Sequence, residues 1–372
     1  MRDLRITGLH LRLVRNRIAM IRSHGIGSVR ETIPRVILRL DTDAGISGWG
    51  EGTPWEAFSG TAEAAFEAID GYFRKHLIGA DAFRLPDIML ACDHEVFGEE
   101  AAKAAVEMAL LDLQGKALEL PVHQLLGGKI RDRIPLSFSI ADPDIEADVE
   151  RARDLVKGGW GIFKVKTGFS SHANDLKRLE MLREGLGDID LRVDYNQGLE
   201  PWDALRTLRD IEEFKPTFIE QPVARQHVDC MADLTAALDT PVMADESVFN
   251  AADALRLVNL RAADLFSCKI MKSGGIRGVQ KVLAIAEAAG IPCYGGTLWE
   301  GPIALTAATH MIAAERNFPL GCEFYMPSVV YSADEIECPF AISEGQVIVP
   351  DRPGLGLDID EDRLDRCTVR SA

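Results

Sequence analysis

Apolar and polar residues alternate in the first part of the chain, from about residue 4 to 14 and again over 32–50. Such alternation is typical of strands with one buried face. Between these strands, residues 23–28 are predicted to form a glycine-rich loop. Apolar residues at helical spacing predict three helices, at 62–77, 85–93 and 99–118. We therefore predict an α+β domain in this part of the chain.

From Ile134 onward, short apolar runs alternate with helical segments, which indicates an α/β fold with a parallel sheet. The runs lie at 134–140, 162–166, 191–193, 218–219, 242–244, 265–268, 291–294 and 320–324. Charged residues at their ends recur every 24 to 28 positions, the length of one strand, one helix and two short loops. We therefore predict a β/α barrel.

After Met326 the alternation stops, and residues 341–349 resemble a hairpin. We expect this tail to return to the N-terminal domain, so that the barrel is inserted between two parts of a cap. The predicted domain limits are 1–128 for the N-terminal part of the cap, 129–327 for the barrel and 328–372 for the tail.

Charged residues stand where several predicted strands end. Asp194, Glu220 and Asp245 each follow an apolar run, and so does Lys269. Polar residues at the C-terminal ends of barrel strands face the barrel mouth. These side chains are therefore expected to converge on one pocket, although each acid alone could equally be a helix cap or a surface charge.

Three converging carboxylates repel one another and raise their pKa values. A hard divalent cation bound through oxygen atoms removes this problem, and Mg²⁺ is the usual choice, with Mn²⁺ as a substitute. The sequence has no cluster of His and Cys that would indicate zinc. We therefore predict Asp194, Glu220 and Asp245 as metal ligands.

Lys164 and Lys166 flank one residue of a strand, so both should face the barrel interior. Two ammonium groups side by side near a dication lower each other's pKa, which makes a base usable near neutral pH. Lys269 lies across the barrel, whereas Lys272 is interpreted as a solvated charge. A substrate carboxylate on the metal could form a stabilised enediolate while lysines on opposite faces remove or deliver a proton.

These residues resemble the enolase superfamily, specifically its muconate lactonizing enzyme subgroup, over essentially the whole chain. The resemblance implies a modified (β/α)7β TIM-type barrel with an α+β cap. It also implies Lys164, Lys166 and Lys269 as catalytic lysines. Asn196 and Glu246 are motif neighbours of the metal ligands and are expected to support them. The mandelate racemase-type subgroup is disfavoured because 293–297 contains no histidine.

Within the subgroup, 294–301 and 321–324 look like the seventh- and eighth-strand segments of muconate-type cycloisomerases. Thr297, Trp299 and Glu323 are accordingly expected to contact the substrate. Racemization or epimerization of an N-acyl amino acid, dipeptide or proline betaine stays open, as does an o-succinylbenzoate synthase-like dehydration.

The cap loops set specificity and depart from the muconate pattern. His24 and Trp55 are candidate substrate contacts, although His24 could simply hydrogen-bond within its loop, and Arg30 could hold a distal carboxylate or be a surface charge. Trp55, Phe58, Trp299 and Tyr325 could form an aromatic wall around the substrate or pack domain against domain.

Composition limits the partners. The chain has 372 residues and a net charge of −17, which argues against nucleic acid or an anionic membrane surface. Seven scattered cysteines and the lack of a signal or membrane segment predict a cytoplasmic protein. The expected partner is a small carboxylate, and the resemblance implies a homo-oligomer. A binding-only barrel would not need paired lysines, and a barrel hydrolase or aldolase would favour histidine ligands or a Schiff-base lysine.

Overall fold

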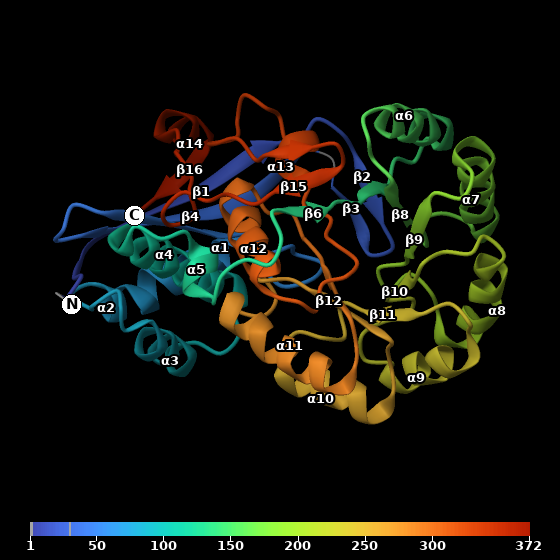
Figure 1. The fold of residues 1–372 in the computed structure, drawn as a ribbon, viewed down its shortest axis with the longest axis horizontal. Coiled ribbons are helices and arrows are strands. Elements are labelled where there is room, and N and C mark those ends of the chain that lie inside the picture. Colours follow the sequence, from blue (N-terminus) through green and yellow to red (C-terminus); the bar gives the residue numbers. More distant parts are fainter. Residues whose placement is uncertain (1–2, 30) are drawn as a thin grey trace.

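The computed structural model describes residues 3–29 and 31–372. Figure 1 shows the N-terminal strands and helices on one side, a barrel on the other, and C-terminal segments that return to the N-terminal side. The predicted fold class, a parallel barrel with an α+β cap, is confirmed. Within the described ranges, no helix is long and apolar enough to cross a membrane.

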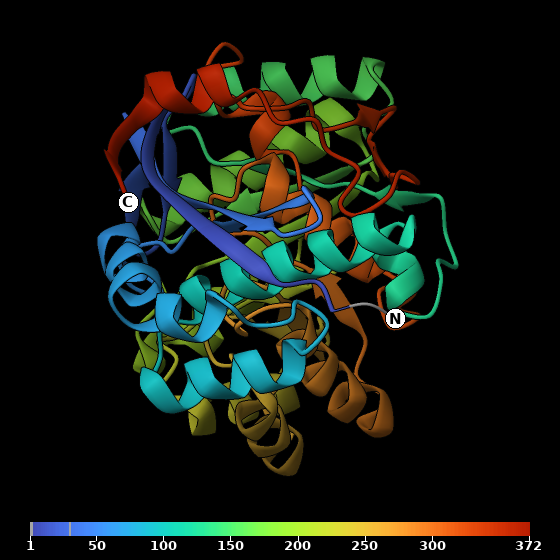
Figure 2. The ribbon, with the colours of Figure 1, turned by 90° about the vertical axis from the view of Figure 1, so that its left-hand side faces the viewer.

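The cap is built on a four-stranded antiparallel sheet. In spatial order its strands are β16 (Thr368–Ser371), β1 (Ile6–Arg17), β4 (Thr32–Thr42) and β5 (Ser47–Gly52). Because β16 pairs with β1, the end of the chain returns to the first long strand, and Figure 2 shows the red C-terminal segment beside the blue strands. The two predicted strand regions of the cap are confirmed.

The helices of the cap follow its sheet in the chain. They are α1 (Ala62–Glu67), the π-helical segment η1 (Ala68–Phe73), α2 (Arg74–Leu77), α3 (Leu85–Glu95), α4 (Glu100–Leu118) and α5 (Val122–Leu125). All three predicted helices are therefore present. Helix α4 lies directly on β5, where a Cβ at Gly50 would come within 1.9 Å of the Ala105 carbonyl oxygen. Only glycine permits this close approach.

The barrel is a curled parallel sheet in which neighbouring strands follow chain order. Its strands are β7 (Phe138–Ile140), β8 (Ile162–Lys166), β9 (Asp190–Asp194), β10 (Ile219–Glu220), β11 (Val242–Ala244), β12 (Leu265–Cys268) and β13 (Cys293–Gly295). The outer helices are α6 (Ile145–Lys157), α7 (His172–Leu186), α8 (Pro201–Glu212), α9 (Val228–Ala237), α10 (Ala251–Leu260), α11 (Ile276–Ala289) and α12 (Pro302–Ala314).

The predicted eighth strand at 320–324 is shorter than expected. Cys322 alone bridges to Leu136 on one side and to Gly295 on the other. The amide of Ser137 donates to the Cys322 carbonyl at 2.8 Å, and the Glu323 amide donates to the Gly295 carbonyl at 3.0 Å. These bonds join the two edges of the sheet and place Glu323 at the barrel mouth.

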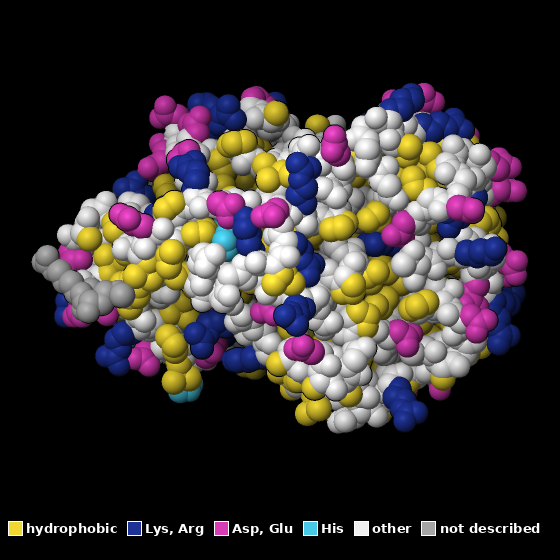
Figure 3. All heavy atoms as spheres, in the orientation of Figure 1, with side chains coloured by type: hydrophobic (Ala, Val, Ile, Leu, Met, Phe, Trp, Pro, Cys, Tyr) yellow, Lys and Arg dark blue, Asp and Glu magenta, His cyan; other side chains and the backbone are white. Residues whose placement is uncertain are grey.

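The tail begins with α13 (Met326–Val329) and later contains α14 (Glu361–Cys367). The predicted hairpin is confirmed as β14 (Ile342–Ser343) and β15 (Gln346–Ile348), and β15 also pairs with β6 (Arg133–Pro135) at the start of the barrel region. On the face drawn in Figure 3, acidic and basic side chains are interspersed. The exact domain limits stay a prediction.

The loop prediction for 23–28 is wrong, because these residues form a short hairpin. Its strands are β2 (Arg22–His24) and β3 (Gly27–Val29). A Cβ at Gly25, between them, would lie 2.0 Å from the Tyr195 carbonyl oxygen. The hairpin therefore rests against the end of β9, and this close contact with the barrel replaces the packing that its sequence lacks.

Candidate active site

Neighbouring strands β8, β9 and β10 bring the first charged residues together. Lys166 is paired in register with Asp194, and Asp194 with Glu220. Lys164 is fully buried, and its Nζ lies 2.8 Å from Glu220, 2.7 Å from Glu323 and 3.1 Å from Asp194. The alternation of β8 thus directs both lysines inward, as the sequence predicts.

The other lysines hold the remaining carboxylates. Nζ of Lys166 donates to Asp194 at 2.5 Å and to Asn196 at 2.9 Å. Across the barrel, Nζ of Lys269 lies 2.6 Å from one oxygen of Asp245, and Nζ of Lys272 lies 2.7 Å from the other. Lys272 is only 1% exposed. Lys272 was interpreted as a solvated charge, and this interpretation is wrong. Nζ of Lys272 is buried and also donates to the main-chain oxygen of Asp245.

Lysine charges divide the four central acids into two classes. Burial would raise the pKa of Asp194 and Asp245, but the lysines beside them hold both values below the usual range. Burial and the charge of Asp194 raise the pKa of Glu220 to about 8. Burial and the charge of Asp245 likewise raise the pKa of Glu246 to about 8. Negative charge is therefore only partly compensated in this cluster.

The carboxylates around Lys164 act against the lowering of its pKa that was expected from a neighbouring ammonium group and a cation. Burial alone would lower the pKa of Lys164, but Glu220, Glu323 and Asp194 raise it well above its usual value. Burial would also lower the pKa of Lys269, but the charge of Asp245 raises it above its usual value. The carboxylates facing each ammonium group outweigh the neighbouring ammonium groups.

The three predicted metal ligands are each paired with a lysine. Over residues 3–29 and 31–372, no group of three or more His, Cys, Asp and Glu side chains is arranged as a metal site. Oε1 of buried Glu220 nevertheless has no hydrogen-bond partner within those ranges. An oxygen-only donor set with a raised carboxylate pKa and an unpartnered oxygen fits a hard divalent cation.

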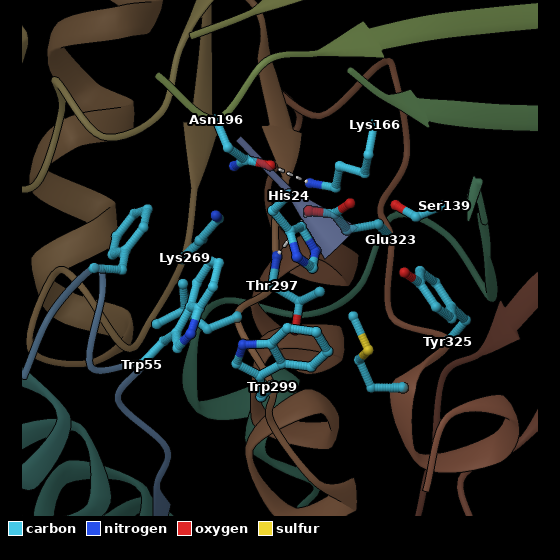
Figure 4. A pocket seen from close by; sticks show the side chains of 13 residues that line it. His24, Trp55, Ser139, Lys166, Asn196, Lys269, Thr297, Trp299, Glu323 and Tyr325 are labelled. Carbon is cyan, nitrogen blue, oxygen red and sulfur yellow. Dashed lines mark hydrogen bonds between the residues drawn. The ribbon is translucent and has the colours of Figure 1, made fainter. Parts of the chain in front are cut away.

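A small pocket lies beside the charged cluster. Its lining residues are His24, Trp55, Phe58, Ser139, Lys166, Asn196, Lys269, Thr297, Leu298, Trp299, Glu323, Tyr325 and Met326. Eight of these were predicted from the sequence, and Figure 4 shows Lys166 with Asn196, and Lys269, reaching it from different strands. Lys164, Asp194, Glu220, Asp245 and Glu246 do not line it. Phe58 and Tyr325 were candidates for an aromatic wall, whereas Ser139, Leu298 and Met326 were missed.

The aromatic residues line the cavity and also pack the cap against the barrel. Trp55 and Trp299 line the cavity and also contact each other edge to face, with ring centroids 5.7 Å apart. Phe58 of the cap stacks on Phe249 of the barrel at 5.4 Å. The ring centroid of His24 lies 5.1 Å from that of Trp55 and 5.3 Å from that of Trp299. These rings therefore wall the cavity and join the two domains, while Arg30 lies outside the described residues.

A second buried ionic cluster fixes the loop that carries Trp299. Arg35 makes a bidentate pair with Glu337 at 3.0 and 2.8 Å and lies 3.2 Å from Glu51. Glu51 accepts from the Gly301 amide at 2.6 Å and from the Ala304 amide at 3.0 Å, at the start of α12. We call Arg35, Glu51 and Glu337 the cap–tail cluster. Its members are distant in sequence, so periodicity could not reveal it.

Comparisons with known proteins agree with this architecture. The model of the mandelate racemase/muconate lactonizing enzyme N-terminal domain matches residues 14–127, and the enolase C-terminal domain-like model matches 147–363. The chain belongs to the mandelate racemase/muconate lactonizing enzyme family of the enolase superfamily. The predicted family is therefore confirmed.

Relatives in this family differ in the reactions their names describe. A muconate cycloisomerase structure from Azorhizobium caulinodans is 49% identical, with a TM-score of 0.87 and 99% of each chain covered. Muconate cycloisomerase 1 of Acinetobacter baylyi is 31% identical over 94% of this chain and 96% of its own. The N-succinyl Arg/Lys racemase structure from Bacillus cereus is 31% identical, with a TM-score of 0.94 and 99% of each chain covered. All three are isomerases, and this chain is an isomerase of the same superfamily.

Proposed function

We propose that the protein catalyses the Mg²⁺-dependent removal or delivery of the proton next to a substrate carboxylate, as a muconate-type cycloisomerase. The main support is the placement of Lys166 and Lys269 in the wall of one cavity. They come from β8 and from the end of β12, and each is held by a different carboxylate. A substrate between them would have a proton carrier on each face.

Asp194, Glu220 and Asp245 are the proposed metal ligands, with Mn²⁺ as a substitute for Mg²⁺. When bound, the cation would supply positive charge for the negative charge that develops on the substrate carboxylate. The side-chain amide of Asn196 donates to Glu246 at 3.2 Å, and the main-chain N–H of Asn196 donates to Asp194 at 2.8 Å. These two bonds would keep the ligand carboxylate oriented.

The lysines have different proposed roles. Nζ of Lys166 and of Lys269 can each hold a proton beside the cavity and exchange it with a carbon atom of the substrate. Lys164 is surrounded by three carboxylates and does not line the cavity, so it would compensate their charge. Glu323 accepts from the Thr297 amide at 3.2 Å and pairs with Lys164, so it would orient both the seventh-strand loop and that lysine.

Racemization or epimerization of an amino-acid derivative is the second candidate. Lysines on two sides of the cavity suit removal of a proton from one face and delivery to the other. A racemase of N-succinyl amino acids is as similar in fold to this chain as several cycloisomerases are. The 49% identity to a cycloisomerase structure favours cycloisomerization.

Proton exchange in D₂O tests the proposal. The protein with Mg²⁺ is incubated with muconolactone, N-succinyl amino acids, dipeptides and proline betaines, and α-deuteration is followed by NMR. Exchange of muconolactone together with consumption of cis,cis-muconate would support cycloisomerization, and exchange with inversion of an amino-acid derivative would support the second candidate. Lys166→Ala and Lys269→Ala should each lower exchange by about 10²- to 10⁴-fold.

Lys177→Ala is the matched control, because Lys177 is a half-exposed helix residue whose ion pair over the described residues is with Glu146 alone, at 3.4 Å. It should leave exchange unchanged. Equal exchange in the wild type and in both active-site variants would refute the assignment of the lysines.

A further inference from the structure

The backbone adopts an uncommon conformation directly after two of the proposed metal ligands. Gln221 follows Glu220 and has a φ of 32°. Asn196 and Gln197 lie two and three positions after Asp194 and have φ values of 41° and 66°. A left-handed backbone is unfavourable for residues other than glycine and persists only where the surrounding structure enforces it. Specific contacts must therefore hold the chain where β9 and β10 end.

The left-handed conformation of Gln221 turns its main-chain carbonyl away from β11. The Gln221 amide still donates to the Met243 carbonyl at 2.9 Å, as in a regular parallel ladder. The next bond of that ladder would run from the Asp245 amide to the Gln221 carbonyl. Instead, this carbonyl accepts from the Gln197 amide at 2.8 Å, beyond the end of β9. The Asp245 amide thus loses its regular partner.

The side chain of Gln221 replaces the missing carbonyl. Its Oε1 accepts from the Asp245 amide at 3.0 Å and from the Ser247 amide at 3.1 Å. Its Nε2 donates to the Val223 carbonyl at 2.9 Å and to Oγ of Ser247 at 2.8 Å. An amide side chain has two acceptor positions and two donor hydrogens, and this fully buried glutamine uses all four. Because the Val223 carbonyl can only accept, the oxygen of the side chain must face Asp245.

Gln221 thereby joins the ends of three neighbouring strands. Asp194 ends β9, Glu220 ends β10, and Asp245 follows β11. Strands β10 and β11 have only two and three residues, and their paired register ends at Glu220 and Met243. This short ladder stops before Asp245. The Gln221 side chain extends the connection to the third proposed ligand.

We infer that Gln221 is a positioning residue for the proposed metal site. Its side chain sets the place of Asp245 relative to the other two ligands, and thereby the affinity for a divalent cation. Within the described residues, Gln221 neither lines the cavity nor donates to a ligand carboxylate, so it acts through the main chain of Asp245. The inference rests on the proposed function for the identity of the metal ligands.

Two substitutions of Gln221 test this role by removing its contacts in different ways. Gln221→Met keeps the length of the side chain but loses the amide. Gln221→Asn keeps the amide and suits the left-handed backbone, but it is one methylene too short to reach the Asp245 and Ser247 amides together. By calorimetry, each variant should bind Mg²⁺ about 10- to 100-fold more weakly than the wild type does.

Gln114→Met is the matched control. Gln114 is a half-buried glutamine of α4, and its Nε2 donates to the Ala82 carbonyl at 2.7 Å in the cap. The control should lose stability through this bond and keep the Mg²⁺ affinity of the wild type. A general loss of stability is thereby separated from a displaced ligand.

Hydrogen exchange in the absence of any cation tests the contact itself. The Asp245 and Ser247 amides should exchange about tenfold faster in both Gln221 variants than in the wild type, because their acceptor is missing or out of reach. Mass spectrometry of the peptide that contains both amides measures this difference. Gln114→Met should leave the exchange of that peptide unchanged.

Wild-type Mg²⁺ affinity in the Gln221 variants would overturn the inference, even if their amides exchanged faster, because the contact would then only support the fold. An equal loss of affinity in Gln114→Met would overturn it as well. If Gln221→Met does not fold, Gln221→Asn decides by the same criteria. A wild type that binds no Mg²⁺ would refute the proposed function and the inference with it. Mg²⁺-dependent proton exchange in the wild type, with unchanged affinity in the variants, would refute the positioning role alone.

Discussion

Two buried ionic clusters of this protein differ in how completely their hydrogen bonds are satisfied. In the cap–tail cluster, the Arg35 guanidinium donates to Glu337 and Asn16 and forms an ion pair with Glu51. Over the described residues, none of its carboxylate oxygens lacks a partner. At the barrel mouth, by contrast, Glu220 and Glu246 each retain an unpartnered buried oxygen.

The difference separates a cluster that is complete by itself from one that a ligand could complete. A fully paired cluster stabilises the junction of cap, barrel loop and tail without help from outside. Unpartnered oxygens and raised carboxylate pKa values are costs to the folded protein that a bound cation would remove. Buried charge alone therefore does not distinguish these two clusters; the completeness of their pairing does.

Arg35→Met should have the largest effect on stability. It leaves Glu51 and Glu337 buried without their counter-ion, which typically costs about 3–5 kcal/mol. Chemical denaturation should show a correspondingly lower free energy of unfolding. Arg206→Met is the control, since Arg206 is a surface residue that, among the described residues, pairs with Asp203 alone. If Arg35→Met were as stable as the control, the cap–tail cluster would not be structural.

The buried carboxylate of Glu107 is intermediate between the two clusters in how well it is paired. Its main partners are backbone amides and not charged side chains. It accepts from the Arg277 amide at 3.2 Å, and burial raises its pKa to about 7. A raised pKa means that the folded state binds the proton more tightly than the unfolded state does. The protonated carboxyl of Glu107 therefore contributes fully to the free energy of unfolding below pH 4.5, the ordinary pKa of a glutamate. This contribution, roughly 3 kcal/mol, is lost as the pH rises through 7.

Glu107→Gln removes this titration, so its melting temperature relative to the wild type should rise between pH 5 and pH 8.5. Glu150→Gln, at an exposed position of α6, should show a pH-independent difference. A constant difference for Glu107→Gln would mean that the buried carboxylate does not titrate in this range.

The sequence predicted which charged residues converge at the barrel mouth better than it predicted the supporting structure. Lys164, Lys166 and the acids at strand ends are visible because the barrel repeat places each of them at the same point of a β/α unit. Lys272 was misjudged because its partner, Asp245, lies on the preceding unit, and a helical or loop position gives no sign of burial. Arg35 and Glu337 are 302 residues apart. No local pattern can connect them.

Mg²⁺ should stabilise the charged cluster at the barrel mouth and leave the cap–tail cluster unaffected. At a concentration one hundred times its dissociation constant, a cation that binds only the folded protein adds about 2.7 kcal/mol. The melting temperature should therefore rise with Mg²⁺ in the wild type. Asp245→Asn should abolish the increase, whereas Asp203→Asn, on the surface of α8, should preserve it. An equal increase in both variants would place the cation elsewhere.

Tyr331→Phe should have the smallest effect on stability. It tests whether the hydrogen bond to the Trp299 loop positions the cavity wall. The variant removes one buried hydrogen bond, from the hydroxyl to the Trp299 carbonyl, and should cost about 1 kcal/mol of stability. Because this bond fixes the loop that carries Trp299, KM should rise while kcat changes little, since no proton carrier is touched. Tyr72→Phe, at a residue 51% exposed on the cap, should change neither quantity. If Tyr331→Phe lost stability but kept its KM, the bond from Tyr331 to Trp299 would stabilise the fold without positioning the cavity wall.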